Sequence, residues 1–271
     1  MKLLVKIGGA QLEQPAARAE LARALGRARA AGHELVVVHG GGNQIRDLVR
    51  RLGLPEQYHQ GLRVTDAQTA EVVLAVLSGS VNKALVAALG AQGLDAVGLC
   101  GADGGSFGAQ ALQLPGVELG YVGRVHTVDR RLVDTLLAGG FVPVIATTAA
   151  LARGCDGPDA HFYNINADMA AGPLGAALRC DAILFLTDVP AVLDAHKQRL
   201  PLLSPAECAR LRESGVIAGG MLPKVEAALE ALASHPGALV KIAPAAGPDC
   251  VLRALDAAVG TLFQAEYATH G

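Results

Sequence analysis

Short apolar runs alternate with amphipathic segments along the whole chain, and glycine-containing turns separate them. Runs of Leu, Val, Ile and Ala with little polar interruption are typical of strands buried on both faces of a parallel sheet. Apolar residues that recur every three or four positions indicate amphipathic helices. The pattern predicts strands at 2–7, 34–39, 96–99, 142–146, 182–187 and 239–242, and helices at 15–31, 43–52, 66–78, 81–92, 130–138, 168–178, 205–214 and 222–235. This alternation predicts an α/β fold with a mostly parallel sheet and helices on both of its faces.

No repeat, low-complexity tract or Pro/Ser-rich linker divides the chain, so we expect a single domain over residues 1–271. The most linker-like stretch is 152–164, which is polar and rich in turn residues. We interpret it as the joint between two lobes, 1–163 and 164–271. Ligands of open parallel sheets bind at the carboxyl ends of the strands, so the loops after the strands are the place to look for chemistry.

The composition argues against several classes of protein. Hydrophobic residues make up 51% of the chain and aromatic residues only 3%, and a net charge of −2 without a polybasic run argues against binding nucleic acid. Five scattered cysteines without a C-x-x-C pair argue against disulfides and zinc, and indicate reduced thiols in the cytoplasm. The longest apolar segment, 132–150, is interrupted by Asp134 and Pro143, so we expect no membrane span.

Glycine-rich loops follow the first two predicted strands, at 8–9 and 40–42. Free N–H groups in such loops, with the positive end of a helix dipole, bind phosphate or carboxylate. Lys6 adds an ammonium group at the same edge, although a surface lysine beside a tight turn is the alternative. We interpret His39 as a structural hydrogen-bonding residue rather than a base. Neither G-x-x-x-x-G-K-[ST] nor a G-x-G-x-x-G after a strand occurs, which argues against a P-loop NTPase or a dinucleotide dehydrogenase.

Further polar residues stand where predicted helices begin. Arg63 lies in a loop where it could pair with a carboxylate, although the loop by itself favours an arginine in solvent. Asn164 and Asn166 share one face of an extended segment that ends at Asp168. Helix capping would account for Asp168 but hardly for both amides. Lys224 stands at the start of a helix, where a cation is unfavourable unless an anion lies nearby.

Taken together and in order, many short stretches of the chain resemble the amino acid kinase family. The resemblance covers nearly the whole chain, and its specificity lies in the order and spacing of the pieces. The matching stretches are "VKIGGA", "VVVHGGGNQI", "GLRVTD", "GSVNKALV", "GLCGADGG", "GYVGRV", "VPVIATTA", "NINADMAA", "LTDVPAVL", "GGMLPKV" and "GTLF".

The resemblance implies a three-layer αβα sandwich that forms homodimers, with an acceptor-binding amino-terminal lobe and a carboxy-terminal lobe that binds ATP. Mg²⁺ would be held through the phosphates of ATP, with no metal site of the protein's own. The implied catalytic residues are Lys6, Lys224 and Asp168; the acceptor-binding residues are Gly41, Gly42, Arg63 and Asn164; Gly8 and Gly9 cradle phosphate; and Asp188, Val189, Leu193 and Gly219 contact the nucleotide.

Within the family, the stretches are most similar to members that phosphorylate the distal carboxylate of N-acetyl-L-glutamate with ATP, in arginine biosynthesis. A carboxylate acceptor is already ionised near pH 7, so this reaction needs no general base. No histidine of the chain has the spacing of a catalytic triad, which agrees with such chemistry. Members of the family that arginine inhibits assemble into hexamers through an extra amino-terminal helix. The first predicted strand begins at Lys2 and leaves no room for that helix. We therefore expect a dimer that is insensitive to arginine.

Two alternatives stay open. The first is a sister kinase that acts on α-aminoadipate carried by a small acidic protein, in lysine synthesis. A basic surface near Arg63 would favour that partner, and the stretch "HQGLRVTDAQ" offers little of it. The second is a non-catalytic nucleotide-binding protein on the same fold, against which the presence of Lys6, Lys224 and Asp168 argues.

Overall fold

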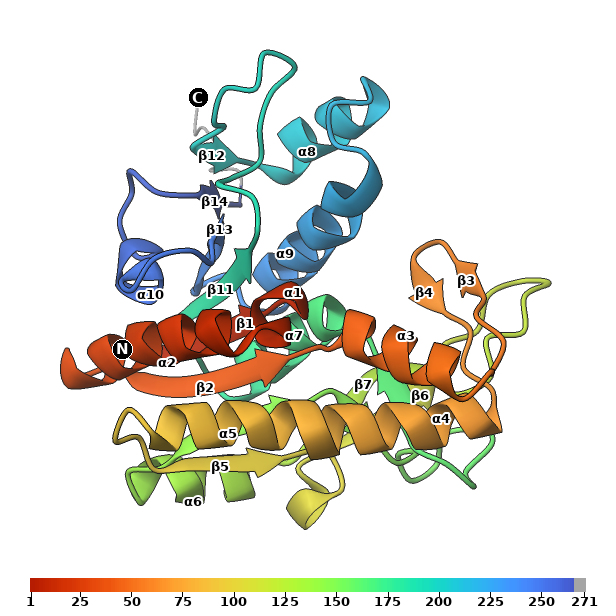
Figure 1. Cartoon of the computed structure of the whole chain (residues 1–271). Coiled ribbons are helices and arrows are strands. Elements are labelled where there is room, and N and C mark those ends of the chain that lie inside the picture. The colour runs from red at the N-terminus through yellow and green to blue at the C-terminus, as the bar shows by residue number, and fades with distance from the viewer. Residues whose placement is uncertain (266–271) are drawn as a thin grey trace.

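The computed structural model describes residues 1–265 and is built around an eight-stranded sheet (Figure 1). The order across the sheet is β12 (Leu202–Leu203), β14 (Thr261–Phe263), β13 (Leu239–Pro244), β11 (Ala182–Thr187), β1 (Lys2–Ile7), β2 (Glu34–His39), β8 (Val142–Ala146) and β5 (Ala96–Leu99). Neighbouring strands are parallel except for β13 and β14. Every strand predicted from the sequence lies in this sheet, and the mostly parallel α/β fold is confirmed.

The central strands are buried on both faces, which is why they form unbroken apolar runs in the sequence. On β2, Leu35 and Val37 belong to one core cluster, and Val36 and Val38 to the other. None of these four side chains is more than 1% exposed. The chain therefore has two cores, one on each side of the sheet.

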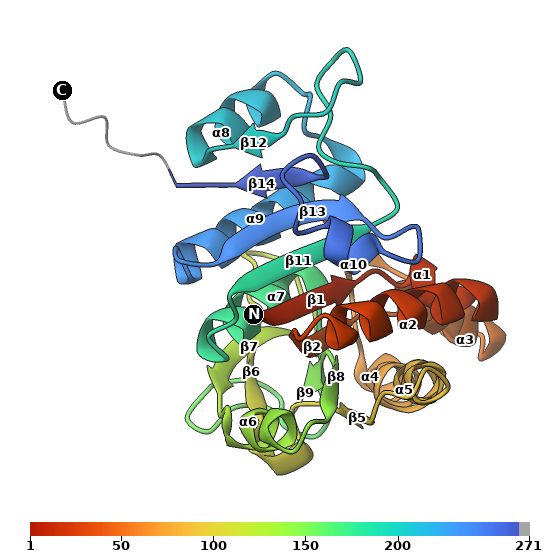
Figure 2. The same ribbon diagram turned by 90° about the vertical axis from the view of Figure 1, so that its left-hand side faces the viewer.

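Helices cover both faces and complete three layers. In Figure 2, α2 and α5 lie to the right of the sheet, and α8 and α9 lie to its left. The first layer comprises α1 (Ala10–Glu13), α2 (Pro15–Ala30), α3 (Gly42–Arg51), α4 (Ala67–Leu74), α5 (Asn82–Gly90) and α10 (Cys250–Arg253), and the second comprises α6 (Arg131–Ala138), α7 (Ala167–Ala177), α8 (Pro205–Glu213) and α9 (Leu222–Ser234). The expected αβα sandwich is thus the observed architecture.

Two helices predicted as separate form one continuous rod. A π-helical segment, η1 (Ala75–Val81), joins α4 to α5 and carries the helix through Gly79, which the sequence analysis treated as a break. The rod Ala67–Gly90 has 24 residues, and an 18-residue window within it has a mean hydropathy of 1.9, so it is long and apolar enough to cross a membrane. One side of it packs in the core, where Val73, Leu77 and Leu85 are buried. A helix that covers the core of a folded protein meets the same criteria.

A second, smaller sheet was missed by the sequence analysis. Its order is β6 (Phe107–Ala111), β7 (Val122–Val128), β10 (Tyr163–Ile165) and β9 (Thr148–Ala149), and a separate hairpin pairs β3 (Tyr58–His59) with β4 (Leu62–Arg63). The short 3₁₀ turns η2 (Asp103–Gly105) and η3 (Gly219–Met221) complete the elements. Most of these strands are short, β7 is partly polar, and the pairing of β6 with β7 shifts register between Gly108 and Ala109, so neither apolar runs nor clean alternation marks them. The predicted division between lobes at 163 and 164 falls inside β10 and stays a prediction, and 266–271 lie outside the described residues.

Helix ends follow the expected chemistry with one difference. Asp66 caps α4, because its Oδ1 accepts a hydrogen bond of 2.7 Å from the Thr69 N–H. Gly139 is the C-cap of α6, and Gly140 after it takes the left-handed conformation, with φ of 84°. At α7 the cap is Asn166 and not Asp168, since Asn166 Oδ1 accepts from the Asp168 N–H at 2.8 Å.

Candidate active site

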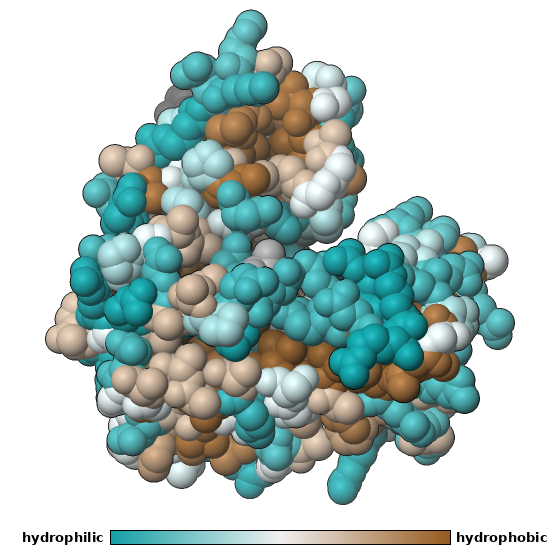
Figure 3. Space-filling model, viewed as in Figure 1, coloured by the Kyte–Doolittle hydropathy of each residue, from teal (hydrophilic) through white to brown (hydrophobic). Residues whose placement is uncertain are grey.

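A cavity of about 520 Å³ opens at the carboxyl ends of the central strands. Figure 3 shows the surface hollowed between the upper part of the molecule and the part at lower right that carries α3, β3 and β4. The lining includes the following residues proposed from the sequence: Lys6, Gly8, Gly9, Gly41, Gly42, Arg63, Asn164, Asp168 and Lys224. Segments from distant parts of the chain therefore meet at one pocket.

The two glycine loops touch each other at the floor of this cavity. A Cβ atom built on Gly9 would lie 3.2 Å from Gly41 Cα and 3.2 Å from Gly42 N, so a side chain there would wedge the loops apart. Gln44 ties the loops together, since its Nε2 donates to Gly9 O at 3.2 Å. Helix α3 begins at Gly42 without a side-chain cap, which leaves backbone N–H groups available to an anion.

Lys6 and Asp168 form a close ion pair at the end of β1. Their Nζ and Oδ1 atoms are 2.7 Å apart, and the side chains are only 5% and 13% exposed. Burial lowers the pKa of Lys6, and the Asp168 carboxylate opposes that shift. Asp168 also lies in the first turn of α7, where the helix dipole favours a negative charge. Strand β1 and helix α7 therefore both hold the ion pair in place.

Lys224 reaches the same cavity from α9, in the opposite half of the chain. Within residues 1–265 it forms no ion pair, and its charge contributes to lowering the pKa of Lys6. A lysine in the first turn of a helix meets the positive end of the dipole. Two ammonium groups, of which one has an unfavourable position, make the pocket strongly attractive to a polyvalent anion.

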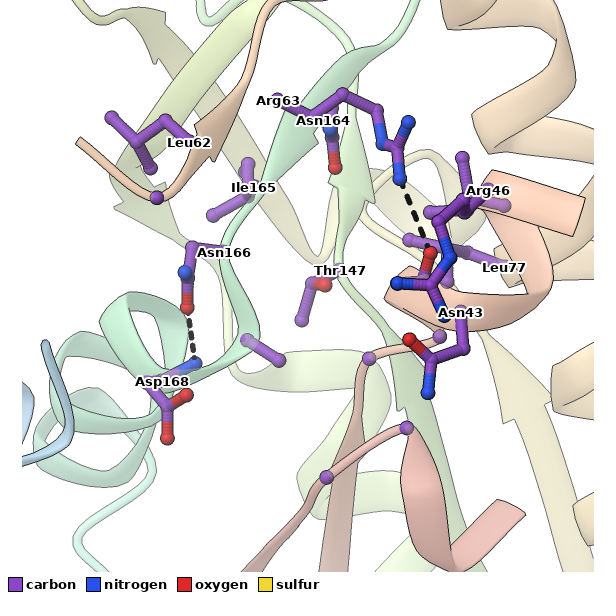
Figure 4. Close-up of a pocket in the computed structure, with 18 of the residues that line it drawn as sticks. Asn43, Arg46, Leu62, Arg63, Leu77, Thr147, Asn164, Ile165, Asn166 and Asp168 are labelled. Carbon is purple, nitrogen blue, oxygen red and sulfur yellow. Dashed lines mark hydrogen bonds between the residues drawn. The ribbon is translucent and has the colours of Figure 1, made fainter. Parts of the chain in front are cut away.

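Arg63 is buried rather than solvated, which settles the alternative left open by the sequence. Its Nη2 donates to Gly42 O at 3.3 Å and to the hydroxyl of Tyr58, and the guanidinium stacks 4.7 Å over the Tyr58 ring. Its Nη1 lies 3.6 Å from Glu56. Asn164 is fixed by a bond of 3.2 Å from its Nδ2 to Thr65 Oγ1. Figure 4 shows Arg63 and Asn164 at one end of the pocket and Asp168 at the other.

The four predicted nucleotide contacts do not line this cavity. Asp188 and Val189 directly follow β11 at the same edge of the sheet, and the charge of Asp188 contributes to the pKa of Lys6. Gly219 opens η3, the turn before α9. Leu193 lies in the loop between β11 and β12 and is half-buried. Their role in binding nucleotide stays a prediction.

Arg46, Tyr58 and Thr147 are among the residues of the pocket wall that the sequence analysis missed. A signal existed for Arg46, because it stands four residues after Gly42 and hence on the same side of α3. Its Nε is buried and has no hydrogen-bond partner among the described residues. Nothing local marks Tyr58 and Thr147, since the missed hairpin and the end of β8 bring them in.

The fold and the pocket define an α/β protein that holds an anion between fixed cations and glycine N–H groups. Comparison with protein families matches residues 1–241 to the amino acid kinase family, and the chain belongs to that family. The acetylglutamate kinase of Brucella anthropi is 42% identical over 240 residues, which cover 85% of this chain and 79% of that protein. The acetylglutamate kinase of Alkalilimnicola ehrlichii is 40% identical over 273 residues, which cover 97% and 88%. The crystal structure of smu.665 from Streptococcus mutans UA159 is similar, with a TM-score of 0.78, 26% identity, and coverage of 98% and 99%.

Proposed function

We propose that this protein is an ATP-dependent kinase that phosphorylates the distal carboxylate of N-acetyl-L-glutamate, as a step of arginine biosynthesis. The observation that carries the proposal is one cavity in which Lys6, Lys224 and Asp168 meet the glycine loops and Arg63. The relatives at 40–42% identity are acetylglutamate kinases, which supports the choice of acceptor.

In the proposed reaction, a carboxylate oxygen of the acceptor attacks the γ-phosphorus of ATP. A new O–P bond forms, the bond from the γ-phosphorus to the β,γ-bridging oxygen breaks, and ADP leaves with that electron pair. The product is an acyl phosphate, and no proton has to move. Because the transition state spreads negative charge over the equatorial oxygens, fixed cations and N–H donors stabilise it more than the ground state.

The roles assigned to residues follow from their positions. Lys6 and Lys224 flank the moving phosphoryl group from opposite walls, and Asp168 holds Lys6 in place. At the far end, Arg63 pairs with the α-carboxylate of the acceptor and Asn164 donates to the same end. The N–H groups of the two glycine loops complete the cradle around the phosphoryl group, and Gly41 and Gly42 also contact the acceptor. The loop after β11 and the turn before α9 contact the nucleotide.

Mg²⁺ enters this proposal with ATP. Among residues 1–265, no three His, Cys, Asp or Glu side chains are grouped so that they could enclose a metal ion. Magnesium commonly keeps its waters and binds substrate phosphates, which suits a site without a protein cage. When bound, the ion neutralises part of the charge on the phosphates.

A homodimer in the cytoplasm is the proposed state of the protein. The outer side of the rod Ala67–Gly90 carries small and apolar residues that the core does not cover, among them the exposed Ala75 and Ala87 and the half-buried Leu74. Figure 3 shows tan and brown residues over α4 and α5. Among the described residues, the neighbouring strand β5 ends the sheet and has no partner strand on its outer edge. Sedimentation equilibrium tests this state, and Ala87→Glu should give monomers.

The test of function is ADP release with a panel of acceptors. We expect turnover with N-acetyl-L-glutamate and much weaker turnover with L-glutamate, L-aspartate and N-acetyl-L-aspartate. An α-aminoadipate derivative bound to an acidic carrier protein tests the sister activity. Preference for that carrier would overturn the choice of acceptor, and absence of turnover with every acceptor would favour a non-catalytic nucleotide-binding protein.

A further inference from the structure

His39, the last residue of β2, lies directly beneath the second glycine loop and is wholly buried. Its Nδ1 is 3.0 Å from Gly40 O, and its Nε2 is 3.0 Å from Asn82 Nδ2. A carbonyl oxygen only accepts and an amide nitrogen only donates, so Nδ1 carries the proton and Nε2 accepts. Burial lowers the pKa of His39 to about 4, in agreement with a neutral ring.

Asn82 is equally fixed, at the start of α5. Its Nδ2 also donates to Val144 O on β8 at 2.9 Å, and its Oδ1 accepts from Lys83 Nζ at 3.0 Å. Lys83 Nζ donates in turn to Gly98 O on β5 at 3.0 Å. A Cβ atom on Gly98 would lie 1.8 Å from Asn82 Oδ1, so the amide occupies space that only glycine leaves open. A fully bonded buried network of this kind has one orientation.

The bond from His39 determines more than the position of one oxygen. The carbonyl of Gly40 and the N–H of Gly41 belong to one planar trans peptide, in which they point in opposite directions. A peptide between two glycines has little conformational preference of its own. Fixing the Gly40 oxygen under the loop therefore fixes where the Gly41 N–H points, and Gly41 lines the cavity.

We propose that His39 and Asn82 are positioning residues that hold the Gly40–Gly41 peptide with its N–H directed at the anionic substrate. Neither side chain is among the residues that line the cavity. The network extends from the phosphate-facing loop through β2 and α5 to β5 at the edge of the sheet. The inference rests on the proposed function, in which Gly41 contacts the acceptor.

The test compares two substitutions of His39 in the full-length protein. His39→Asn keeps an amide donor near the place of Nδ1, whereas His39→Leu fills the space without a donor. We expect His39→Leu to raise the KM for N-acetyl-L-glutamate about tenfold or more, as the loss of an oriented hydrogen bond to a charged group does, with a change in the KM for ATP of less than about twofold. His39→Asn should recover most of this loss.

Asn82→Ala tests the same network without touching the loop. It should also raise the KM for N-acetyl-L-glutamate. In the double variant His39→Leu/Asn82→Ala, the rise in this KM should be smaller than the two single effects combined. Val38→Ala, an adjacent buried substitution on β2, is the control for general destabilisation and should leave both KM values unchanged. If His39→Leu does not fold, His39→Asn and Asn82→Ala decide the matter.

Equal kinetics for wild type, His39→Leu and Asn82→Ala would overturn the positioning role. An equal rise in the KM for N-acetyl-L-glutamate in His39→Leu, His39→Asn and Val38→Ala would overturn it too, since that outcome indicates a merely structural effect. Wild-type protein without turnover on N-acetyl-L-glutamate would instead contradict the proposed function, so the two failures are distinguishable.

Discussion

The proposed acceptor wall of the pocket and the proposed nucleotide wall beside it are built in different ways. We define the acceptor wall as Lys6, the two glycine loops, Arg63 and Asn164, and the nucleotide wall as Lys224, the loop after β11 and the turn before α9. Side chains of the acceptor wall are buried and bonded, as the Lys6–Asp168 ion pair and the bond from Arg63 to Gly42 show. On the nucleotide wall, Asp188, Gly219 and Gly220 are exposed.

The difference indicates where the geometry of the reaction is prepared before substrates bind. Fixed groups stabilise a transition state without reorganisation at the moment of reaction, and the acceptor wall satisfies that condition. Lys224 has no ion pair within residues 1–265, and in the proposed reaction the phosphate of ATP is its partner. We expect the acceptor wall to determine which acceptor is used, and the nucleotide wall to become ordered when ATP binds.

The largest effect is expected for Lys224→Ala, which removes a cation that acts on the transition state. Turnover should fall by about 10²–10³-fold while both KM values change little. Steady-state kinetics measure this, with Arg210→Ala, which removes an exposed cation on α8 outside the pocket, as the control. Turnover at the wild-type level in Lys224→Ala would show that the nucleotide wall takes no part in the chemistry.

Arg63→Ala should separate the two walls. It removes the partner of the acceptor's α-carboxylate and should raise the KM for N-acetyl-L-glutamate about 10–100-fold, with little change in the KM for ATP. Arg51→Ala, at the exposed end of α3, is the matched control. A rise in the KM for ATP instead would mean that Arg63 was assigned to the wrong substrate.

The pH dependence of turnover tests Lys6. Burial lowers the pKa of this lysine, and only its charged form stabilises the phosphoryl group, so turnover should be full below that pKa and decline as the pH rises through it. Lys6→Arg stays charged over the whole range, so its profile should lack this alkaline decline. If the turnover of Lys6→Arg declined at alkaline pH in the same way as that of the wild type, the titrating group would be one other than Lys6.

The smallest effect is expected far from the chemistry. Ser204 and Glu207 form a capping box at α8, in which Ser204 Oγ accepts from the Glu207 N–H at 3.2 Å and Glu207 Oε2 accepts from the Ser204 N–H at 2.7 Å. Ser204→Ala should lower the free energy of unfolding by about 1 kcal/mol without altering turnover. Denaturant unfolding measures this free energy. A lower turnover under conditions where the variant is fully folded would show that α8 is coupled to the nucleotide wall.

The sequence predicts well the elements whose burial leaves a pattern of apolar residues along the chain. The bounds of β1 and β2 follow from runs that are apolar because both faces of the sheet are covered. The smaller sheet could not be found in this way, since its strands are held by partners distant in sequence, such as Val122 beside Asn164. Hairpin β3–β4 was missed because its strands have two residues each, too few to form a pattern. Likewise the π-helical turn that keeps Gly79 inside a helix depends on packing and not on local preference.

The candidate site shows the same limit. Glycine loops, Lys6 and Lys224 carry a local signal, because bare backbone and misplaced charge are unusual in themselves. The sequence around Arg63 did not decide whether its side chain is solvated. Its burial against Tyr58 and Gly42 shows that it belongs to the pocket. Tyr58 and Thr147 reach the pocket through tertiary structure that no short pattern encodes.

Binding of a planar mimic of the transferred phosphoryl group measures the central claim most directly. Aluminium fluoride, MgADP and N-acetyl-L-glutamate should form a tight ternary complex with the wild-type protein, detected by isothermal titration calorimetry. In Lys224→Ala and in Lys6→Ala, that complex should weaken by about 100-fold or more, while MgADP and N-acetyl-L-glutamate alone bind nearly as before. Equal affinity of the mimic for the wild-type protein and both variants would contradict the account.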